Sequence, residues 1–450
     1  MEQKVYPVRN RRFSNGVWIV SVNMGYGHQR TAYPLRDLAF KGEIVNANSY
    51  QGIPEKDRKI WEGTRGFYEF ISNFSRIPLI GETAFSVYDE FQKILGFYPK
   101  RDLSQPNFTL KQIYSSFKKG WGRDLIEKLK INPLPLITTF FPPAFMAEFF
   151  GYPGDIFCVV CDADISRTWA PLNPKESKIK YFAPNSRVVE RLKLYGVRAK
   201  NIFLTGYPLP LENIGVSPPA GGLEILKEDL RLRLLNLDPQ KRYFEKYKTL
   251  IEEKVGKLPE KSDHPLTILF SVGGAGAQKE IGVKILKNLN WKIKQGEIKI
   301  ILSAGIREKV KEYFEKNIKR LNLTKCGENG SSYIEIIFEK DIESYFQKFN
   351  QALRKTDILW TKPSELSFYA ALGLPIIIAP PVGSQEGFNR RWLLKSGFGD
   401  SQEDPNHTDQ WLFDWLESGY FAEHAMEGFV EGEKLGTLKI KEIIQKCPGS

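Results

Sequence analysis

The chain has 450 residues, of which 42% are hydrophobic and 26% charged, so its composition is that of a globular protein and excludes disordered and fibrous classes. Its length suffices for two or three domains. The formal net charge of +12 favours an acidic partner such as a phosphate-bearing substrate, an anionic membrane surface or nucleic acid, although a lysine-rich solvated surface explains it equally well.

Apolar runs in the chain are only as long as strands, whereas about 20 apolar residues are needed to cross a bilayer. The first residues also lack the apolar stretch of a signal peptide. We therefore expect a cytoplasmic protein, with peripheral association to the inner face of the membrane as an option.

Short apolar runs alternate with amphipathic stretches along most of the chain. Strands are predicted at residues 17–22, 43–48, 134–140, 155–161, 201–205, 266–272, 298–303, 333–338, 357–360 and 375–379. Helices are predicted between many of them, for example at 184–195, 278–290, 306–320 and 385–395. This alternation indicates βαβ units and parallel sheets covered on both faces. Because it runs in two blocks, we expect an α/β protein of two Rossmann-like domains that face each other across a cleft.

Two stretches depart from the alternation. Residues 50–130 are rich in aromatic and basic residues and predict a helical insertion. This insertion either covers the sheet as a packed helical hairpin or forms a surface that contacts a bilayer or an apolar acceptor. Residues 208–264 carry dense charge and predict two helices plus the connection between the domains. The predicted boundaries are 1–210 for the first domain, 211–264 for the connection, 265–425 for the second domain and 426–450 for a tail helix.

Cysteines and histidines number four each. Four cysteines in this length do not make a disulfide framework. Cys158 and Cys161 form a CxxC, but they are three residues apart on a predicted strand and would point to opposite faces. No second CxxC occurs, and no two histidines stand at the spacing of metal ligands, so a metal centre is not expected.

The first glycine loop is "NMGYGHQRTAYPL", which follows the predicted strand 17–22. Gly25 and Gly27 flank Tyr26, and His28 comes next. In doubly wound folds ligands bind beyond the carboxyl ends of strands, where glycine lets the backbone approach the ligand. There His28 can serve as a general base on a hydroxyl group, since its ordinary pKa is close to working pH. A helix cap or a surface position explains this histidine equally well.

The second loop has the same place in the second block. The strand 266–272 leads into a glycine-rich turn and then a helix from about Gln278, and no Walker A sequence occurs. Backbone N–H groups of such a turn can cradle a diphosphate. The turn contains Gly273, Gly274 and Gly276.

The third motif, residues 357–399, gathers polar side chains at successive strand ends, as is typical of a nucleotide-sugar site. They are Thr361, Lys362, Ser364 and Glu365 after one strand, and Gln385, Glu386 and Asn389 after the next. Glu365 also fits a helix start, where a carboxylate complements the helix dipole.

In this order the motifs resemble the GT-B glycosyltransferases, in particular the monogalactosyldiacylglycerol synthase type and processive diacylglycerol glycosyltransferases. The N-acetylglucosaminyltransferase of the lipid-linked peptidoglycan precursor is a more distant resemblance. The corresponding segments here are "GYGH", "VVCD", Trp169, "KYFAPNSRVVERLKLYGV", "IFLTGYPLP", "VGGAGAQ", "TKPS", "GLP" and "GSQEGFN". The match covers about residues 17–49, 134–210 and 265–400.

The resemblance implies a GT-B transferase with an acceptor on the first domain, a nucleotide-diphosphate sugar on the second, and no obligatory metal or other cofactor. It makes His28 the general base. It assigns acceptor-side positions to Gly25, Gly27, Asp162, Arg167 and Trp169. It assigns donor binding to Gly273, Gly274, Gly276, Gln278, Thr361, Lys362, Ser364, Glu365, Gln385, Glu386 and Asn389. It also implies that the tail helix returns to the first domain.

Three departures from the family pattern stand out. Tyr26 replaces a glycine of the first loop, and Arg167 lies near the place of an expected histidine. Phe368 stands where a glutamate commonly holds the ribose, and Glu365 one turn earlier is the candidate substitute. These departures are compatible with a changed substrate and with a protein that has lost transferase activity.

The leading hypothesis is inverting transfer of a hexose from a nucleotide-diphosphate sugar, with a UDP-sugar as the favoured donor, to a hydroxyl acceptor for which a membrane lipid is one candidate. A non-catalytic nucleotide-sugar-binding or scaffold protein is the alternative, supported by Phe368 and Arg167. A nucleotide-sugar epimerase using Asp162, Asp164 and Glu365 is a third. No sequence motif of a nucleic-acid-binding module occurs, so nucleic acid is not an expected partner.

Overall fold

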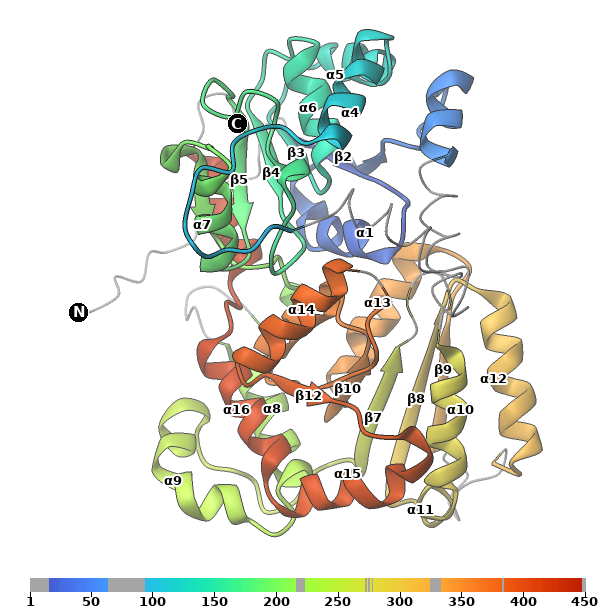
Figure 1. The fold of residues 1–450 in the computed structure, drawn as a ribbon. Coiled ribbons are helices and arrows are strands. Elements are labelled where there is room, and N and C mark those ends of the chain that lie inside the picture. The colour runs from blue at the N-terminus through green and yellow to red at the C-terminus, as the bar shows by residue number, and fades with distance from the viewer. Residues whose placement is uncertain are drawn as a thin grey trace. The chain divides into compact units, whose positions relative to one another are not determined.

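The computed structural model describes residues 16–63, 94–271, 273, 276, 278–323, 333–382 and 384–446, except 216–222. The chain folds into two compact units. The N-terminal unit is formed by the described parts of Arg9–Leu209, Val382–Asn389 and Leu435–Ser450. The C-terminal unit is formed by those of Pro210–Pro381 and Arg390–Lys434. Figure 1 labels many of the elements of both.

The N-terminal unit is built on a six-stranded sheet in the order β2-β1-β3-β4-β5-β6, and every neighbouring pair is parallel. Its strands are β1 (Val17–Ser21), β2 (Ala39–Asn46), β3 (Leu136–Thr138), β4 (Ile156–Val159), β5 (Lys180–Ala183) and β6 (Ile202–Leu204). The strand order reverses between β1 and β3, because β2 lies on one side of β1 and all later strands lie on the other. That reversal is the topological switch point of the sheet, where open α/β folds bind ligands.

Helices cover this sheet on both faces. They are α1 (Tyr26–Ala32), η1 (Tyr33–Leu38), α4 (Phe108–Lys118), α5 (Arg123–Lys130), α6 (Phe141–Phe149), η2 (Arg167–Trp169), α7 (Ser186–Leu194), η3 (Ala199–Asn201) and α17 (Gly436–Gln445), and residues 55–63 are helical as well. Asparagine side chains start two of them, since Asn107 accepts from the Leu110 N–H and Asn185 from the Val188 N–H. Residues 64–93, most of the predicted aromatic insertion, lie outside the described part.

The core of the N-terminal unit includes the last helix of the chain. Ile440 and Ile444 of α17 are fully buried in one cluster with Val17 and Ile19 of β1 and with Phe157 of β4. Thr437 Oγ1 also donates to the Leu209 carbonyl at 2.6 Å. The apolar face of α17 is thus buried against the N-terminal sheet, whose first strand begins at Val17.

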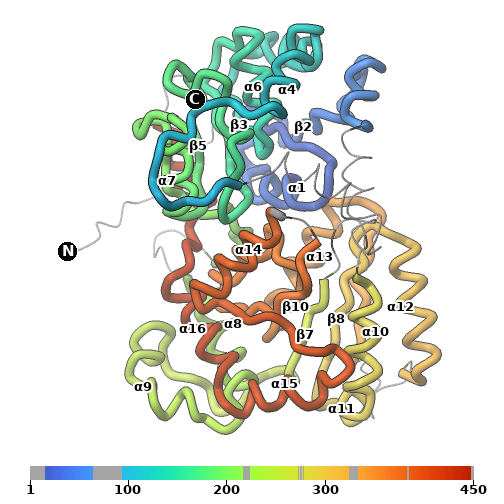
Figure 2. The backbone as a smooth tube through the Cα atoms, in the orientation of Figure 1, coloured from blue at the N-terminus to red at the C-terminus, as the bar shows by residue number. Residues whose placement is uncertain are grey.

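A long segment without regular structure, residues 94–107, runs beside α7, as Figure 2 shows. The Leu103 N–H donates to the Leu194 carbonyl at 2.9 Å, and Arg191 Nη1 donates to the Leu95 carbonyl at 2.9 Å. The Arg187 guanidinium lies 4.0 Å from the ring centre of Phe97. Backbone bonds and a cation–π contact therefore fix this segment to the helix.

The C-terminal unit has a second six-stranded parallel sheet, in the order β12-β11-β10-β7-β8-β9. Its strands are β7 (Leu266–Ser271), β8 (Ile298–Gly305), β9 (Ile334–Phe338), β10 (Ile358–Thr361), β11 (Ile376–Ile378) and β12 (Gly399–Ser401). Counted from β7 as strand 1, the order reads 3-2-1-4-5-6, the arrangement of dinucleotide-binding folds. The switch point lies between β7 and β10. The predicted pair of Rossmann-like domains is confirmed.

The helices of the C-terminal unit are η4 (Leu211–Asn213), α8 (Glu224–Leu237), α9 (Arg242–Val255), α10 (Lys279–Asn288), α11 (Asn290–Gln295), α12 (Glu308–Arg320), α13 (Ile342–Leu353), η5 (Glu365–Leu372), η6 (Pro405–His407), α15 (Thr408–Glu417) and α16 (Tyr420–Glu431). The division between the units passes through α14 (Ser384–Lys395), after Asn389. In α12 the buried residues Val310, Phe314 and Ile318 recur every four positions, which makes one apolar stripe.

The stretch predicted to connect the domains is an integral part of the C-terminal unit. Arg233 of α8 is 2% exposed and donates to the carbonyls of Thr356 at 2.8 Å and Leu372 at 2.8 Å. Its guanidinium thereby satisfies carbonyls at the beginning of β10 and at the end of η5. Burial lowers the pKa of this arginine, against the opposing charges of Asp229 and Asp357.

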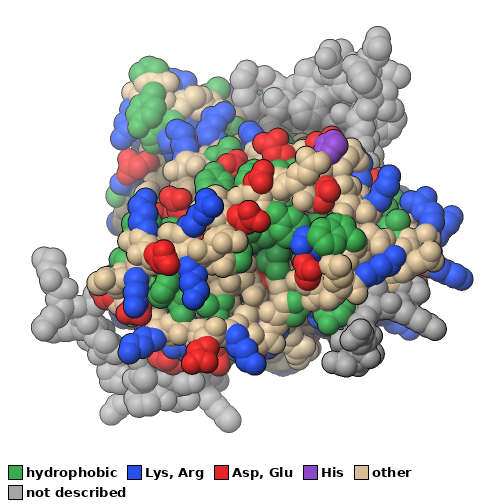
Figure 3. Space-filling model, turned by 90° about the horizontal axis from the view of Figure 1, so that it is seen from below, with side chains coloured by type: hydrophobic (Ala, Val, Ile, Leu, Met, Phe, Trp, Pro, Cys, Tyr) green, Lys and Arg blue, Asp and Glu red, His purple; other side chains and the backbone are tan. Residues whose placement is uncertain are grey.

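Charges of both signs are interspersed on the face drawn in Figure 3, with hydrophobic side chains between them. This face thus carries no uniformly basic field, although the chain has a formal charge of +12. Among the described residues, none of the helices combines the length and the apolar character that a bilayer span requires.

Candidate functional site

His28 lies at the switch point of the N-terminal sheet. It belongs to α1, which begins five residues after the end of β1, and its Nδ1 atom is 2.7 Å from the carbonyl oxygen of Thr139, directly after β3. A carbonyl can only accept a hydrogen bond, so Nδ1 carries the proton. The lone pair of the neutral ring is therefore on Nε2, which is the tautomer that a base toward a hydroxyl group needs.

The surroundings of His28 are mostly apolar. Its ring centre is 4.5 Å from that of Phe140, and the Cys161 sulfur is 3.5 Å from Nδ1. Burial lowers the pKa of His28 to about 4, against a smaller opposing effect of the Thr139 hydrogen bond. The residue as a whole is only half-buried, so one side of it stays accessible. At neutral pH the ring is uncharged and able to accept a proton.

The loop that carries His28 is fixed by a reciprocal pair of hydrogen bonds. The Asn23 N–H donates to Asn48 Oδ1 at 2.9 Å, and Asn48 Nδ2 donates back to the Asn23 carbonyl at 3.1 Å. Gly25 precedes α1 with φ of 107°, and a Cβ atom there would meet nothing within 4 Å. The loop therefore needs glycine for its backbone angle and leaves open space beside it. Gly27 is inside α1, where its carbonyl accepts from Thr31 Oγ1 at 2.8 Å.

Asp162 and Asn389 are neighbours within the N-terminal unit. Asn389 Oδ1 accepts from the Ala163 N–H at 2.8 Å, and Asn389 Nδ2 donates to Asp162 Oδ1 at 3.3 Å. Asn389 is 1% exposed. In the structure its amide contacts the loop after β4, and its predicted role in donor binding stays a prediction.

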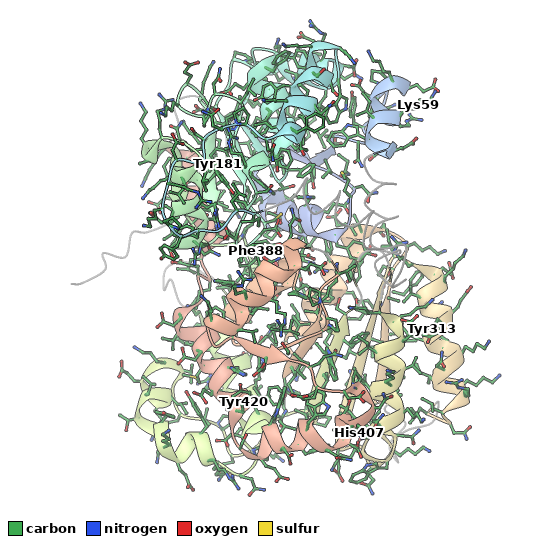
Figure 4. All side chains as sticks on the ribbon, in the orientation of Figure 1. Lys59, Tyr181, Tyr313, Phe388, His407 and Tyr420 are labelled. Carbon is green, nitrogen blue, oxygen red and sulfur yellow. The ribbon has the colours of Figure 1, made fainter. Side chains whose placement is uncertain are left out.

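Arg167 and Trp169, the other two predicted acceptor-side residues, are buried and hydrogen-bonded within the N-terminal unit. The Arg167 guanidinium donates to the carbonyls of Ser104, Ala170 and Pro171 at 2.6 to 3.0 Å. Trp169 is 2% exposed and its carbonyl accepts from the Tyr181 hydroxyl at 2.8 Å. Tyr181 is labelled in Figure 4. Arg167 thus fastens segment 94–107 to the loop after β4.

A buried ion pair stands next to Asp162. Arg191 Nε and Nη2 each lie 2.8 Å from one carboxylate oxygen of Asp164, and the two side chains are 1% and 8% exposed. Asp164 Oδ1 also accepts from the Ile165 N–H at 3.0 Å. Because both oxygens are engaged, this carboxylate is poorly suited to acid–base chemistry on a substrate.

The glycine turn of the C-terminal unit lies at the switch point between β7 and β10. The Gly276 N–H donates to the Gly273 carbonyl at 2.7 Å, and Gly276 has φ of 70°. A Cβ atom on Gly273 would be 2.4 Å from Cε of Lys362, which follows β10. Glycine at this position thus lets the lysine side chain lie against the turn. Gly274 is outside the described residues.

Other predicted donor residues surround the same strand ends. Gln278 Nε2 donates to the Pro380 carbonyl at 2.7 Å, which joins the turn to the end of β11. Thr361 is 1% exposed, and its hydroxyl is 3.4 Å from the Ser271 carbonyl across β10 and β7. Ser364 precedes η5, and Glu365 is its first residue and is half-buried. Lys362, Ser364 and Glu365 thus follow the end of β10 directly in sequence.

Gln385 and Glu386 lie in the first turn of α14 and are grouped with the N-terminal unit. Glu386 Oε2 accepts from the Val382 N–H at 2.7 Å, which is a capping contact at a helix start. Phe368, in the place of the expected glutamate, is 4% exposed and its ring centre is 5.0 Å from that of Trp392. Phe368 therefore packs in the hydrophobic core of the C-terminal unit.

Comparison with known proteins gives a family model described as "Domain of unknown function (DUF6938)", which matches residues 256–390. No curated protein matches the chain. Among solved structures, MurG of Acinetobacter baumannii is 16% identical, with a TM-score of 0.43, over 76% of this chain and 79% of that one. UDP-GlcNAc 2-epimerase of Neisseria meningitidis bound to UDP-GlcNAc is 13% identical, with a TM-score of 0.43, over 77% of this chain and 84% of that one. UDP-GlcNAc 2-epimerase of Methanocaldococcus jannaschii is 14% identical, with a TM-score of 0.41, over 96% of this chain and 100% of that one.

These identities and scores are too low to bear on the reaction of this chain, so its own residues must indicate the chemistry. Within the described residues no three His, Cys, Asp or Glu side chains are grouped so as to hold a metal ion.

Sequence reasoning missed three contributors to the first site, Thr139, Cys161 and Asn48. Thr139 contributes its backbone carbonyl, which every residue type has, so the contact with His28 cannot be inferred from the residue type. Cys161 was considered only as part of a CxxC pair that could bind a metal. Asn48 is the last residue of the second predicted strand, 43–48, and a polar side chain at a strand end was the one signal available.

Proposed function

We propose that the protein is a glycosyltransferase of the GT-B type that moves a hexose from a nucleotide-diphosphate sugar to a hydroxyl acceptor. The observation that carries this proposal is the placement of both glycine loops. One presents a neutral histidine at the β1/β3 switch point, and the other presents Lys362 and a glycine turn at the β7/β10 switch point. A base and a diphosphate site are the two parts that such a transfer needs.

In the proposed reaction, Nε2 of His28 takes the proton of the acceptor hydroxyl as its oxygen attacks the anomeric carbon of the donor. The bond between that carbon and the diphosphate breaks, with inversion, and the diphosphate leaves with the electron pair. The Lys362 ammonium, which lies against Gly273, stabilises the leaving charge. A UDP-sugar is the donor we propose, and no metal takes part in this scheme.

A lipid acceptor is the more specific proposal. It is supported by two exposed aromatic residues of the N-terminal unit, Tyr98 at 72% and Phe108 at 65%, in a segment that also carries Lys100, Arg101 and Lys111. Aromatic and basic side chains together suit an anionic membrane surface. Assays that offer the acceptor hydroxyl in vesicles and in free solution decide between a lipid and a water-soluble acceptor.

The epimerase alternative is weakened by one observation. It would need several carboxylates for acid–base steps, and Asp164 is held by Arg191 in a bidentate ion pair. A non-catalytic protein was suggested by Phe368 and Arg167. Both side chains have structural contacts in their own units, so neither indicates a lost reaction by itself.

Donor binding is tested by thermal shift with UDP, UDP-glucose, UDP-galactose, UDP-N-acetylglucosamine and their GDP, ADP and dTDP counterparts. A ligand at ~100 times its dissociation constant stabilises the fold by roughly 2.7 kcal/mol. We expect a selective shift that Lys362→Ala reduces. Lys355→Ala is the matched control, because Lys355 precedes the same strand at its amino end. No shift with any nucleotide would reject the proposal and favour the scaffold form of the non-catalytic alternative.

The pH dependence of kcat/KM is a second prediction. A base must be unprotonated, and the folded-state pKa of His28 is lowered to about 4, so activity should be lost only as the pH falls through about 4. An acid limb near the ordinary histidine pKa of about 6.5 would contradict the assignment of His28 in this environment. Circular dichroism at each pH separates loss of activity from loss of the fold.

A further inference from the structure

A histidine with two carboxylate partners lies at the amino ends of β7 and β10, which are neighbours in the C-terminal sheet (Figure 1). His264 belongs to the segment that joins α9 to β7, and its side chain is 9% exposed. Its Nδ1 atom is 2.6 Å from Oδ1 of Asp263, and its Nε2 atom is 3.3 Å from Oδ1 of Asp357. Asp357 directly precedes β10 and is fully buried. The proposed function uses none of these three residues.

The two contacts determine the charge of the His264 ring. An ionised carboxylate only accepts hydrogen bonds, so a ring nitrogen that faces one must carry a proton. Because each nitrogen faces a carboxylate, both are protonated and the ring is an imidazolium. Burial by itself would lower the pKa of His264, but hydrogen bonds and charges of Asp357 and Asp263 outweigh burial and raise it. This arrangement is the opposite of that of His28, whose Nδ1 atom faces a carbonyl and whose pKa is lowered.

The buried carboxylate of Asp357 connects three parts of the unit. Its Oδ2 atom accepts from the Thr267 N–H of β7 at 2.8 Å and from Asn236 Nδ2 of α8 at 2.9 Å. Its Oδ1 atom is the one that faces His264. A neutral ring can donate to only one of its two carboxylates, so a lone pair must then face a carboxylate oxygen. Loss of the ring proton is therefore unfavourable for the folded arrangement.

The other charged groups around this cluster are held mainly by ion pairs and come from α8, from α13 and from the loop before β10. Lys355 of that loop forms an ion pair with Asp263. Arg354, at the end of α13, also attracts this carboxylate, and Arg233 of α8 attracts the other one. Asp229 of α8 binds Arg354 at 2.8 Å. Histidine is the side chain whose ordinary pKa lies between pH 5 and 8, so the ring is the group of this cluster that changes charge near neutral pH.

We propose that His264 is a pH-sensitive latch of the C-terminal unit, which as an imidazolium ties residues 256–265 to the start of β10 and as a neutral ring releases them. Residues 256–265 contain no helix or strand, so their position depends on such side-chain contacts. Since folding raises the pKa of His264, the stabilisation is complete below about pH 6.5 and is lost as the pH rises through the raised value.

The latch and the proposed donor site are at opposite ends of the same strands. His264 precedes β7 and Asp357 precedes β10, whereas Gly273 and Lys362 come after them. A strand of six residues such as β7 spans roughly 20 Å. The latch can therefore be measured whether or not the protein is a glycosyltransferase.

The charge of the ring is tested by ¹⁵N NMR of the histidine side chains in the full-length protein. The chain has four histidines, and His264→Gln assigns the resonances of this one. At pH 7 both ring nitrogens of His264 should have the chemical shifts of protonated nitrogens. His28, with a pKa of about 4, should show one protonated and one unprotonated nitrogen in the same spectrum. A neutral His264 ring at pH 7 would overturn the proposal.

Release of the segment is tested by limited digestion with a lysine-specific protease at pH 6.5 and pH 9. Lys257 and Lys261 lie in the segment and are exposed. Cleavage after them, followed by mass spectrometry and divided by the rate for a free peptide of the same sequence at each pH, should be at least threefold faster at pH 9. Equal normalised rates in the unaltered protein would contradict the latch, and this measurement needs no variant.

A matched pair of variants assigns the pH dependence to one residue. In His264→Gln the side chain does not titrate, so the normalised cleavage rate should be the same at both pH values. His407→Gln changes an exposed histidine of η6 and should keep the full rise between pH 6.5 and pH 9. A rise that persists in His264→Gln would show that another group releases the segment and would reject the proposal.

Discussion

Replacement of His28 by alanine is expected to lower kcat for sugar transfer by about 10²- to 10⁴-fold, the usual contribution of a general base. The affinity for the nucleotide sugar should hardly change, because the proposed donor contacts come from Lys362 and the Gly273–Gly276 turn. Turnover is measured as sugar transferred per unit time, and donor affinity by thermal shift. Full turnover in the variant would remove His28 from the mechanism.

Two further variants separate chemistry from structure. His28→Gln can keep a donor toward the Thr139 carbonyl but has no basic nitrogen, so it should be as inactive as the alanine variant while its melting temperature stays close to that of the parent. His407→Ala changes an exposed histidine of η6 and should leave kcat unchanged. Activity in the glutamine variant would mean that the imidazole ring of His28 only fills space and does not act as a base.

Replacement of Arg191 by methionine should destabilise the N-terminal unit by about 3–5 kcal/mol, the usual cost of leaving one member of a buried ion pair alone. The two side chains are 1% and 8% exposed, so water cannot solvate the Asp164 carboxylate that remains. The variant also loses the bond to the Leu95 carbonyl, which helps to hold segment 94–107. Denaturant unfolding followed by tryptophan fluorescence measures the change.

The control for this prediction is Lys193→Met on the same helix. Lys193 pairs with Glu190 at 2.7 Å, but both side chains are more than 40% exposed, and such pairs contribute about 0–1 kcal/mol. A loss below ~1 kcal/mol for Arg191→Met would show that the bidentate pair does not stabilise the unit. The double variant Asp164→Leu, Arg191→Met should recover part of the loss, because no unpaired charge is then buried.

The sequence was sufficient to predict the parts of the fold that depend on local pattern. Buried strands such as β1 and β7 appear as short apolar runs, and amphipathic helices such as α12 as a four-residue recurrence. Glycines follow β1 and β7 at the switch points of the two sheets, the place where doubly wound folds bind ligands. The short strands β5 and β12 gave weak or no apolar runs, and β5 was visible only through the family resemblance.

What the sequence could not predict are the partners of the site residues. The contact of His28 with the Thr139 carbonyl depends on β3 pairing with β1, and the order of strands in a sheet is not encoded in local periodicity. The amide of Asn389 meets Ala163, which is 226 residues away in sequence. Arg167 and Phe368 depart from the family motifs in sequence, yet only the packing shows that the first binds carbonyls and the second a tryptophan ring.

The burial of α17 in the first sheet has a consequence for how the protein forms during synthesis. Ile440 and Ile444 complete a core whose other members begin at Val17. The ribosome adds about 5–20 residues per second, so the stretch 210–434 alone delays the last helix by roughly 10–45 s. Throughout that interval the nascent N-terminal unit carries an apolar surface that α17 has not yet covered, which makes it a natural client for chaperones.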